Sequence, residues 1–194
     1  MAKILHAALA ASEKIMRNSN RVWKTVVSYL HIMKSVLIIR HAKSSWEHVL
    51  QKDFDRPLNE RGHKDAPAMA KRLLDKKISI EAFIASPALR AFTTAGYFAK
   101  AYGRQEKDII TYPELYEAPA PVFYNLIAKT NDKLNDIAIF SHNPGITDFV
   151  NSLTNSRVGD MPTCAIFAVQ ADINRWADFE KAEKTFWFFD YPKA

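Results

Sequence analysis

The sequence contains a single cysteine, Cys164. A lone thiol cannot form an internal disulfide, so the fold does not depend on an oxidising compartment. The sequence also lacks an uncharged apolar run of the roughly 18 residues that could cross a bilayer. These absences predict a cytoplasmic protein without a transmembrane segment.

No internal repeat, low-complexity tract or linker divides residues 35–194. With 48% hydrophobic and 12% aromatic residues, the chain has enough apolar material for one packed core. We therefore predict one catalytic domain over residues 35–194, preceded by an extension over residues 1–34.

The net charge of +6 is concentrated in that extension. Residues 1–34 hold six basic residues and one acidic residue, which leaves a net charge of only +1 for residues 35–194. The domain itself therefore gives no reason to expect nucleic-acid binding, and a salt-sensitive affinity through residues 1–34 is the weaker alternative.

The spacing of apolar residues in the extension can line one face of a helix. Three interpretations fit it. The segment is a helical accessory element, a basic helix for surface binding or targeting, or a non-native start, since Met33 closely precedes the first strong strand.

Short apolar runs alternate with helical spacing from residue 35 onward. Runs at 36–39, 82–85 and 137–140 are typical of strands covered on both faces, and helix-like spacing occupies 66–74, 89–102 and 122–128. This order predicts right-handed crossovers and a three-layer α/β/α fold with a mainly parallel central sheet.

Two details of this fold stay open. Runs at 165–169 and 186–189 can pair as an antiparallel edge. The first helix either is capped by Asn59 and kinked at Pro67, or begins near Asp65 with Pro67 in its first turn.

Polar side chains follow three of the predicted strands. Arg40 and His41 come directly after the first strand, Arg90 lies in the first turn of the helix after the second, and His142 follows the third. Because ligands bind at the carboxyl edge of open parallel sheets, we expect these side chains to share one rim.

Two guanidinium groups suit a doubly charged tetrahedral anion such as phosphate. A neutral imidazole beside them can attack phosphorus, and a second histidine can donate to a phosphoryl oxygen in the transition state. Each motif alone is an ordinary strand end or helix cap, but their coincidence at three strand ends predicts a phosphoryl-transfer site.

Four segments, in this order and spacing, resemble the histidine phosphatase superfamily, which includes the phosphoglycerate mutases. They are LIIRHAKSSW, DFDRPLNERG, SPALRAFTTA and FSHNPG, and the resemblance covers about residues 35–190. The chain is most similar to the small SixA-type phosphohistidine phosphatases of that superfamily, which implies a phosphoglycerate mutase-like fold.

The resemblance implies that His41 is the phosphorylated nucleophile and that Arg40, Arg90 and His142 hold the phosphoryl group. Ser44 and Asn143 are further candidates for substrate binding. Two positions depart from the wider family: Ala42 replaces the usual glycine after the histidine, as is common in the SixA-type branch, and Glu47 replaces a phosphate-binding asparagine of the mutases.

Larger relatives use a glutamate as general acid, and Glu117 or Glu114 in the segment PELYEAP can supply it. We name Glu117 as the candidate. SixA-type proteins can also act without such an acid, because imidazole leaves more easily than an alkoxide. A solvated loop charge is the ordinary interpretation of both glutamates.

The remaining candidates are discounted. His6, His31, His48 and His63 lack metal-ligand spacing, and Cys164 borders an apolar strand and is expected to pack. We expect no metal and no cofactor. The expected function is removal of phosphate from phosphohistidine on a protein. The alternatives are a small-molecule phosphomonoesterase or mutase-like enzyme, and a non-catalytic phosphate-binding adaptor. The sequence does not indicate the oligomeric state.

Overall fold

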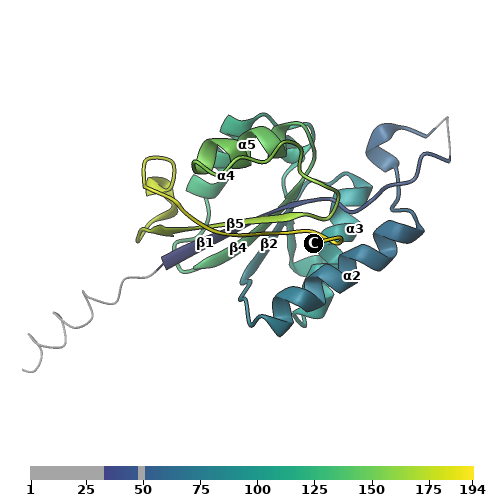
Figure 1. Ribbon diagram of the computed structural model, residues 1–194, viewed down its shortest axis with the longest axis horizontal. Coiled ribbons are helices and arrows are strands. Elements are labelled where there is room, and N and C mark those ends of the chain that lie inside the picture. The colour runs from purple at the N-terminus through teal and green to yellow at the C-terminus, as the bar shows by residue number, and fades with distance from the viewer. Residues whose placement is uncertain (1–32, 48–50) are drawn as a thin grey trace, which may run out of the picture. The chain divides into compact units, whose positions relative to one another are not determined.

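A computed structural model describes residues 33–47 and 51–194 of the chain. In these residues one sheet has the strand order β3-β2-β4-β1-β5-β6 (Figure 1). The strands are β1 (Met33–Arg40), β2 (Ala82–Ala85), β3 (Ile109–Thr111), β4 (Asp136–Ser141), β5 (Ile166–Asp172) and β6 (Thr185–Asp190). The α-helices are α2 (Glu60–Asp75), α3 (Leu89–Ala101), α4 (Ala120–Ala128) and α5 (Gly145–Leu153), and short 3-10 turns include η1 (Asp53–Asp55) and η3 (Pro113–Leu115).

The sheet is mainly parallel, as the sequence predicts. Strands β3, β2, β4 and β1 run parallel to one another, with Leu37 of β1 opposite Ala138 of β4. Strand β5 pairs antiparallel with β1, and β6 pairs antiparallel with β5, which confirms the predicted antiparallel edge. Strand β3 was not predicted, because it is only three residues long and buries one of them.

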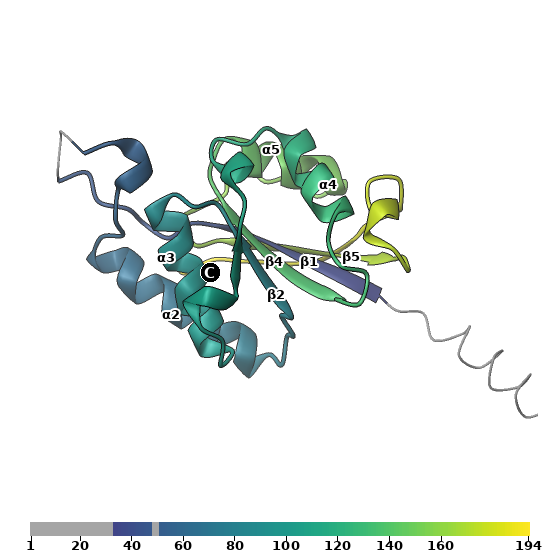
Figure 2. The ribbon, with the colours of Figure 1, turned by 180° about the vertical axis from the view of Figure 1, so that it is seen from behind.

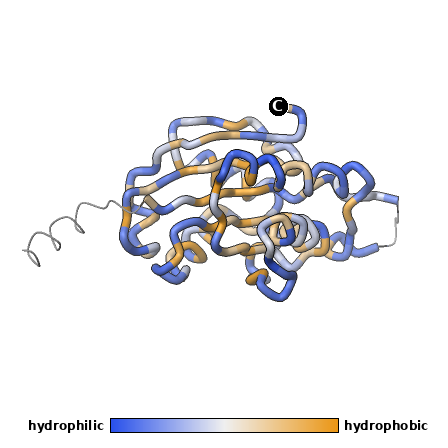
Figure 3. The backbone as a smooth tube through the Cα atoms, turned by 90° about the horizontal axis from the view of Figure 1, so that it is seen from below, coloured by the Kyte–Doolittle hydropathy of each residue, from blue (hydrophilic) through white to orange (hydrophobic). Residues whose placement is uncertain are grey.

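Alternate residues of β1 face two separate hydrophobic layers. Val36 and Ile38 belong to the core under α4 and α5, where Phe123 and Phe149 stack with ring centroids 4.7 Å apart. Leu37 and Ile39 face the core under α2 and α3. Figures 1 and 2 show these helix pairs on opposite sides of the sheet, and Figure 3 shows hydrophobic colour along extended segments of the chain viewed from below.

Helix α2 begins after Asn59, whose side-chain oxygen accepts a hydrogen bond of 2.9 Å from the backbone N–H of Gly62. This is N-terminal capping, which satisfies a backbone donor that the first turn leaves free. Pro67 therefore lies inside the helix. Of the two helix starts that the sequence left open, the structure contains the first.

The first strand begins at Met33, so Lys34 is part of the sheet. The Lys34 side chain is buried, and its ammonium group donates hydrogen bonds to the carbonyl oxygens of Asp132 and Leu134. The predicted extension otherwise lies outside the described residues. In the part of the chain that the structure describes, every helix is too short or too polar to span a membrane.

Candidate active site

Three strand ends deliver the predicted side chains to one cavity of about 280 Å³. Arg40 is the last residue of β1 and His41 follows it, His142 follows β4, and Arg90 lies in the first turn of α3 just after β2. Because β1, β4 and β2 are parallel neighbours, their carboxyl ends meet at one edge of the sheet. The cavity is lined by Arg40, His41, Lys43, Ser44, Trp46, Asp53, Arg56, Arg90, Glu117, His142, Asn143 and Thr163.

The His41 ring is fixed by two hydrogen bonds. Its Nδ1 lies 2.7 Å from the carbonyl oxygen of Ala42, which can only accept, so Nδ1 carries the proton. In the neutral ring, Nε2 then holds the lone pair, and Arg90 Nε lies 3.3 Å from it. The nitrogen that bears the lone pair is therefore the one that faces Arg90.

The His142 ring lies beside His41, with ring centroids 5.0 Å apart. Its Nε2 is 2.8 Å from Ser86 Oγ, which itself accepts a hydrogen bond from the backbone N–H of Ala88. We assign the Ser86 hydroxyl proton to the bond with Nε2, which leaves the His142 proton on Nδ1. His142 thus has a free N–H donor.

Both imidazoles are held in the neutral form. Burial, followed by the nearby Arg90, Arg40 and Arg56 guanidinium groups, lowers the pKa of His41 from 6.5 to about 3, against an opposing effect of the Ala42 carbonyl. Burial, followed by the charges of His41 and Arg90, lowers the pKa of His142 to about 2. At neutral pH the positive charge of the cavity therefore comes from arginines rather than from histidines.

Two buried side-chain nitrogens at this site have no hydrogen-bond partner. They are Arg40 Nε and His142 Nδ1, and among residues 33–47 and 51–194 they are the buried side-chain nitrogen or oxygen atoms left without one. Buried donors are normally satisfied, so two unpaired donors on side chains that line one cavity need an explanation. Both side chains line the cavity, so an anion bound there is one partner that would satisfy them.

The remaining predicted residues also line the cavity, but they differ in how many of their polar atoms already form hydrogen bonds. Ser44 Oγ accepts a hydrogen bond of 2.6 Å from Arg56, and the Asn143 amide already donates to Asp160 and to the Met161 carbonyl. Glu117 is exposed at the cavity and has a backbone φ of 51°. Glu114 lines a different hollow beside α4, so the structure brings only one of the two candidate acids to the site.

The structure brings together further residues that the sequence interpretation did not assign. Asp53 and Arg56 reach the cavity from the segment around η1. The Trp46 ring stacks on the Arg56 guanidinium, with 3.2 Å between the guanidinium carbon and the ring centroid. The rings of Tyr116 and His142 are T-shaped to each other. Asp53 and Arg56 fall within DFDRPLNERG, one of the segments that carry the family resemblance. The motif could have indicated that Asp53 and Arg56 belong to the site. Its sequence alone does not show which residues they contact.

Other discounted residues lie elsewhere. Cys164 is fully buried, as expected, and His63 bonds Tyr97 on the surface. Glu47 is exposed, and His6, His31 and His48 lie outside the described residues. Within the described ranges, no group of three or more His, Cys, Asp or Glu side chains is placed to hold a metal ion.

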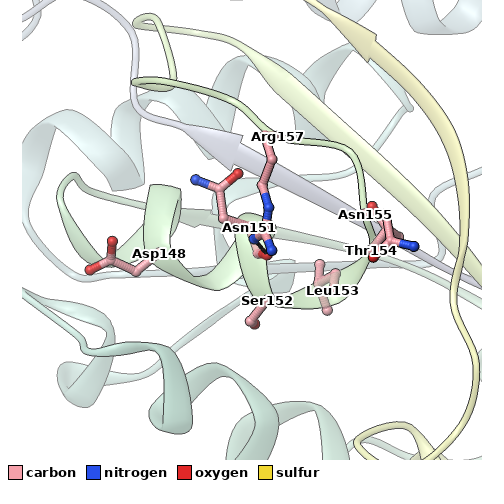
Figure 4. Close-up of a pocket in the computed structure, with 7 residues that line it drawn as sticks. All are labelled: Asp148, Asn151, Ser152, Leu153, Thr154, Asn155 and Arg157. Carbon is pink, nitrogen blue, oxygen red and sulfur yellow. Dashed lines mark hydrogen bonds between the residues drawn. The ribbon is translucent and has the colours of Figure 1, made fainter.

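A larger hollow of about 480 Å³ lies over the C-terminal end of α5 (Figure 4). Its polar groups already bond to the loop beside it: Asn151 pairs with the backbone of Val158, and Arg157 donates to the Asn151 carbonyl oxygen. This hollow has no histidine and no converging cations among its lining residues. Size alone therefore does not make it the reactive site.

The layers and strand order described above are those of the phosphoglycerate mutase-like α/β fold. Residues 36–136 match the model of the histidine phosphatase superfamily (branch 1). The chain belongs to the histidine phosphatase superfamily. The matched range includes His41 and Arg90 and ends before His142, which the geometry of the structure places at the same cavity.

Several solved structures share this fold. A protein histidine phosphatase SixA solved with tungstate is 26% identical, with a TM-score of 0.70 over 82% of this chain and 97% of that one. A chain from Agrobacterium tumefaciens described as a candidate phosphohistidine phosphatase SixA is 23% identical, with the same TM-score over 82% and 98%. A mycobacterial glucosyl-3-phosphoglycerate phosphatase, at 14% identity and a TM-score of 0.60 over 81% and 99%, shares the fold.

One curated relative is similar over much of the chain. It is a protein of Arabidopsis thaliana described as uncharacterized and chloroplastic, 26% identical over 155 residues. The alignment covers 76% of this chain and 71% of the relative.

Proposed function

We propose that this protein is a phosphatase that removes phosphate from phosphohistidine on another protein through a phosphohistidine intermediate at His41. In the first step His41 Nε2 attacks phosphorus, and the bond from phosphorus to the substrate nitrogen breaks. In the second step water attacks the phosphorus, loses a proton, and the bond from phosphorus to His41 Nε2 breaks, which releases inorganic phosphate and restores the lone pair on Nε2.

The observation that carries this proposal is the pair of unsatisfied donors. Arg40 Nε and His142 Nδ1 are buried without partners beside the neutral His41 ring, whose Nε2 bears a lone pair. A phosphoryl group would accept from both donors while its phosphorus faces Nε2. Fixed donors aimed at developing negative charge supply much of the stabilisation in such reactions.

Arg90 is proposed to hold the same group from the other side. Its Nε lies 3.3 Å from His41 Nε2, so a phosphoryl group on that nitrogen would remain next to a guanidinium through both steps. Ser44 and Asn143 are proposed as further contacts with the substrate, because both line the cavity.

Glu117 is the proposed proton donor to the leaving group and the proton acceptor for the attacking water. It is the glutamate that lines the cavity, and its left-handed backbone conformation is uncommon for a residue with a side chain. Imidazole is a better leaving group than an alkoxide, so this help matters less for phosphohistidine than for a phosphate ester. Glu117→Gln is therefore expected to slow ester hydrolysis more than phosphohistidine hydrolysis.

The proposed substrate is a protein, because the cavity rim carries exposed side chains outside the reactive centre. Trp46 is 71% exposed beside Arg56, and Lys43 also lines the rim. The SixA structure at 26% identity is described as a protein histidine phosphatase, which supports the same substrate class. We propose the cytoplasm as the compartment, and since the Arabidopsis relative is described as chloroplastic, fractionation of cells is the direct test.

A panel of substrates tests the function. Residues 33–194 and the full chain are assayed against a phosphotransfer protein phosphorylated on histidine with phosphoramidate, and against p-nitrophenyl phosphate and phosphosugars. Faster turnover of the phosphorylated protein is expected. Preference for the phosphosugars would instead favour a small-molecule phosphatase, and binding of phosphate without any turnover would favour an adaptor.

A further inference from the structure

Asp53, on the 3-10 turn η1, is the junction of a hydrogen-bond network around the reactive cavity. One carboxylate oxygen accepts from Arg90 at 2.8 Å and from Tyr116 at 2.9 Å, and the other accepts from Arg56 at 2.7 Å. Its backbone carbonyl oxygen also accepts from Arg90. One residue therefore contacts three side chains from three different parts of the chain.

Each of those side chains leads to the reactive centre. Arg90 donates from its Nε to His41, and Tyr116 presents its ring edge to His142 with centroids 5.7 Å apart. Arg56 donates to Ser44 and to the carbonyl oxygen of Ser45 at the cavity wall.

The burial of the two arginines makes this support necessary. Arg90 is 5% exposed and Arg56 is 8% exposed. In the part of the chain that the structure describes, Asp53 is the carboxylate that pairs with each of them. A buried guanidinium that loses its carboxylate partner is left uncompensated, so it moves or draws in solvent.

Arg90 has enough N–H donors to bind Asp53 and a phosphoryl group at the same time. A guanidinium has five N–H donors, and Asp53 engages the terminal nitrogens while Nε points to His41. Two N–H donors remain on the terminal nitrogens after these bonds are counted. Asp53 can therefore hold the outer edge of Arg90 while the guanidinium still binds a phosphoryl oxygen.

We propose that Asp53 is a positioning residue, which fixes Arg90, Arg56 and Tyr116 around the phosphoryl group and acts on the reaction through them. The expected effect on the reaction rate rests on the proposed function. The expected effect on oxyanion binding does not. Asp53 itself stays outside the reacting atoms.

Asp55 provides a matched control on the same turn. It is an exposed aspartate two residues away, and no hydrogen bond or ion pair of its side chain is found in the described residues. Asp55→Asn and Asp53→Asn change the same charge by the same chemistry. A difference between these two variants thus reports on contacts rather than on net charge.

The test compares wild type, Asp53→Asn, Asp53→Ala and Asp55→Asn in three measurements. These are the single-turnover rate of phosphoenzyme formation from the histidine-phosphorylated protein, the dissociation constant of tungstate by calorimetry, and the midpoint of thermal unfolding. We expect a loss of rate of about 10-fold for Asp53→Asn and about 10²-fold for Asp53→Ala, as for other groups that preorganise charge. Tungstate binding should weaken at least about 5-fold in Asp53→Ala, while Asp55→Asn matches wild type in all three measurements. Loss of the Asp53 carboxylate also lowers the unfolding midpoint of Asp53→Ala, so rates and tungstate affinities are compared per folded molecule.

Three outcomes would overturn the positioning role. If both Asp53 variants react as fast as Asp55→Asn, Asp53 has no positioning role. Tighter tungstate binding in Asp53→Asn would make the carboxylate a competitor of the anion. A lowered unfolding midpoint with unchanged rate and tungstate affinity per folded molecule would leave Asp53 as a structural residue only.

The rate and tungstate measurements also distinguish failure of this inference from failure of the proposed function. If wild type forms no phosphoenzyme, the proposed function fails while the tungstate measurement still decides the role of Asp53. If wild type forms a phosphoenzyme and Asp53→Ala forms it equally fast, only the positioning role fails.

Discussion

His41 and His142 are kept uncharged by burial and by arginines, and this sets the chemistry of the cavity at the scale of single residues. A protonated His41 could not attack phosphorus, because its lone pair would be lost. The sequence predicted the neutral state from the proximity of two arginines. The structure adds that burial is the larger cause, and that Arg56 is a third contributing cation.

The depressed pKa values predict how stability responds to acid. The folded state keeps both histidines neutral down to a pKa of about 3 for His41 and about 2 for His142, whereas in the unfolded chain they protonate near 6.5. The unfolded state therefore binds more protons below pH 6.5, so stability that is complete above that value is lost as the pH falls towards 3. The expected slope reaches about 1.4 kcal/mol per pH unit for each histidine.

Urea unfolding of wild type and of the double variant His41→Gln/His142→Gln between pH 7 and 4.5 measures this slope. The double variant should show a flatter dependence than wild type. His63→Gln, which alters an exposed histidine, serves as the control. An unchanged slope in the double variant would contradict the assigned protonation states.

The sequence identified Arg40, His41, Arg90 and His142 as a group because each follows an apolar run that reads as a buried strand. It could not identify Asp53, Arg56 and Tyr116 as their neighbours. Asp53 meets Arg90 across 37 positions and Tyr116 across 63, so the contacts depend on the folded path of the chain and leave no local periodicity.

At the scale of elements, the site depends on close contact between the first residue of α5 and the segment before α4. The Gly145 position lies against the backbone of Ala118, and a Cβ atom placed there would be 1.7 Å from the Ala118 carbonyl oxygen. Gly145 follows His142 by three residues, and Ala118 follows Glu117 directly. A side chain at position 145 would thus force apart two segments that both carry proposed catalytic residues.

Gly145→Ala is accordingly expected to lower the free energy of unfolding by about 2 kcal/mol or more. Gly96→Ala is the matched control, because a Cβ atom there would meet nothing closer than 3.7 Å and the residue lies within α3. That variant should be neutral or stabilising by up to about 1 kcal/mol. Urea unfolding of the two variants side by side decides the point, and equal effects would show that the segments do not touch as described.

Strands β1, β2 and β4 were predictable because strands covered on both faces are continuous apolar runs. Strand β3 and the turn η1 were not, since each is three residues long and mostly exposed. The start of α2 needed the structure as well, because Asn59 and Asp65 are both acceptable beginnings for a helix that contains Pro67.

At the scale of the whole molecule, residues 35–194 carry a net charge of only +1, yet positive charge converges at the cavity. Arg40, Lys43, Arg56 and Arg90 all line it, against the carboxylates of Asp53 and Glu117. Within residues 33–47 and 51–194, this local concentration makes the cavity the expected anion site.

Oxyanion binding should therefore stabilise the entire fold. Tungstate at 100 times its dissociation constant adds about 2.7 kcal/mol, which corresponds to a rise of roughly 5–10 °C in Tm for a domain of this size. His142→Ala should reduce the shift at the same tungstate concentration, because it removes the Nδ1 donor. No shift in wild type would argue against an anion site at this edge of the sheet.

The same protein is expected to work without a metal ion. Incubation with EDTA, followed by removal of the chelator, should leave the rate of phosphate release unchanged. Activity that is lost to EDTA and restored by an added divalent cation would require a different mechanism.

The central claim is that His41 carries the phosphoryl group during turnover. Rapid mixing with a histidine-phosphorylated protein, an alkaline quench and peptide mass spectrometry measure it most directly. We predict an acid-labile phosphate on His41 within the first turnover, absent from His41→Ala, which should have no turnover. Phosphate release at an undiminished rate by His41→Ala, or a trapped phosphate on another residue, would contradict the account.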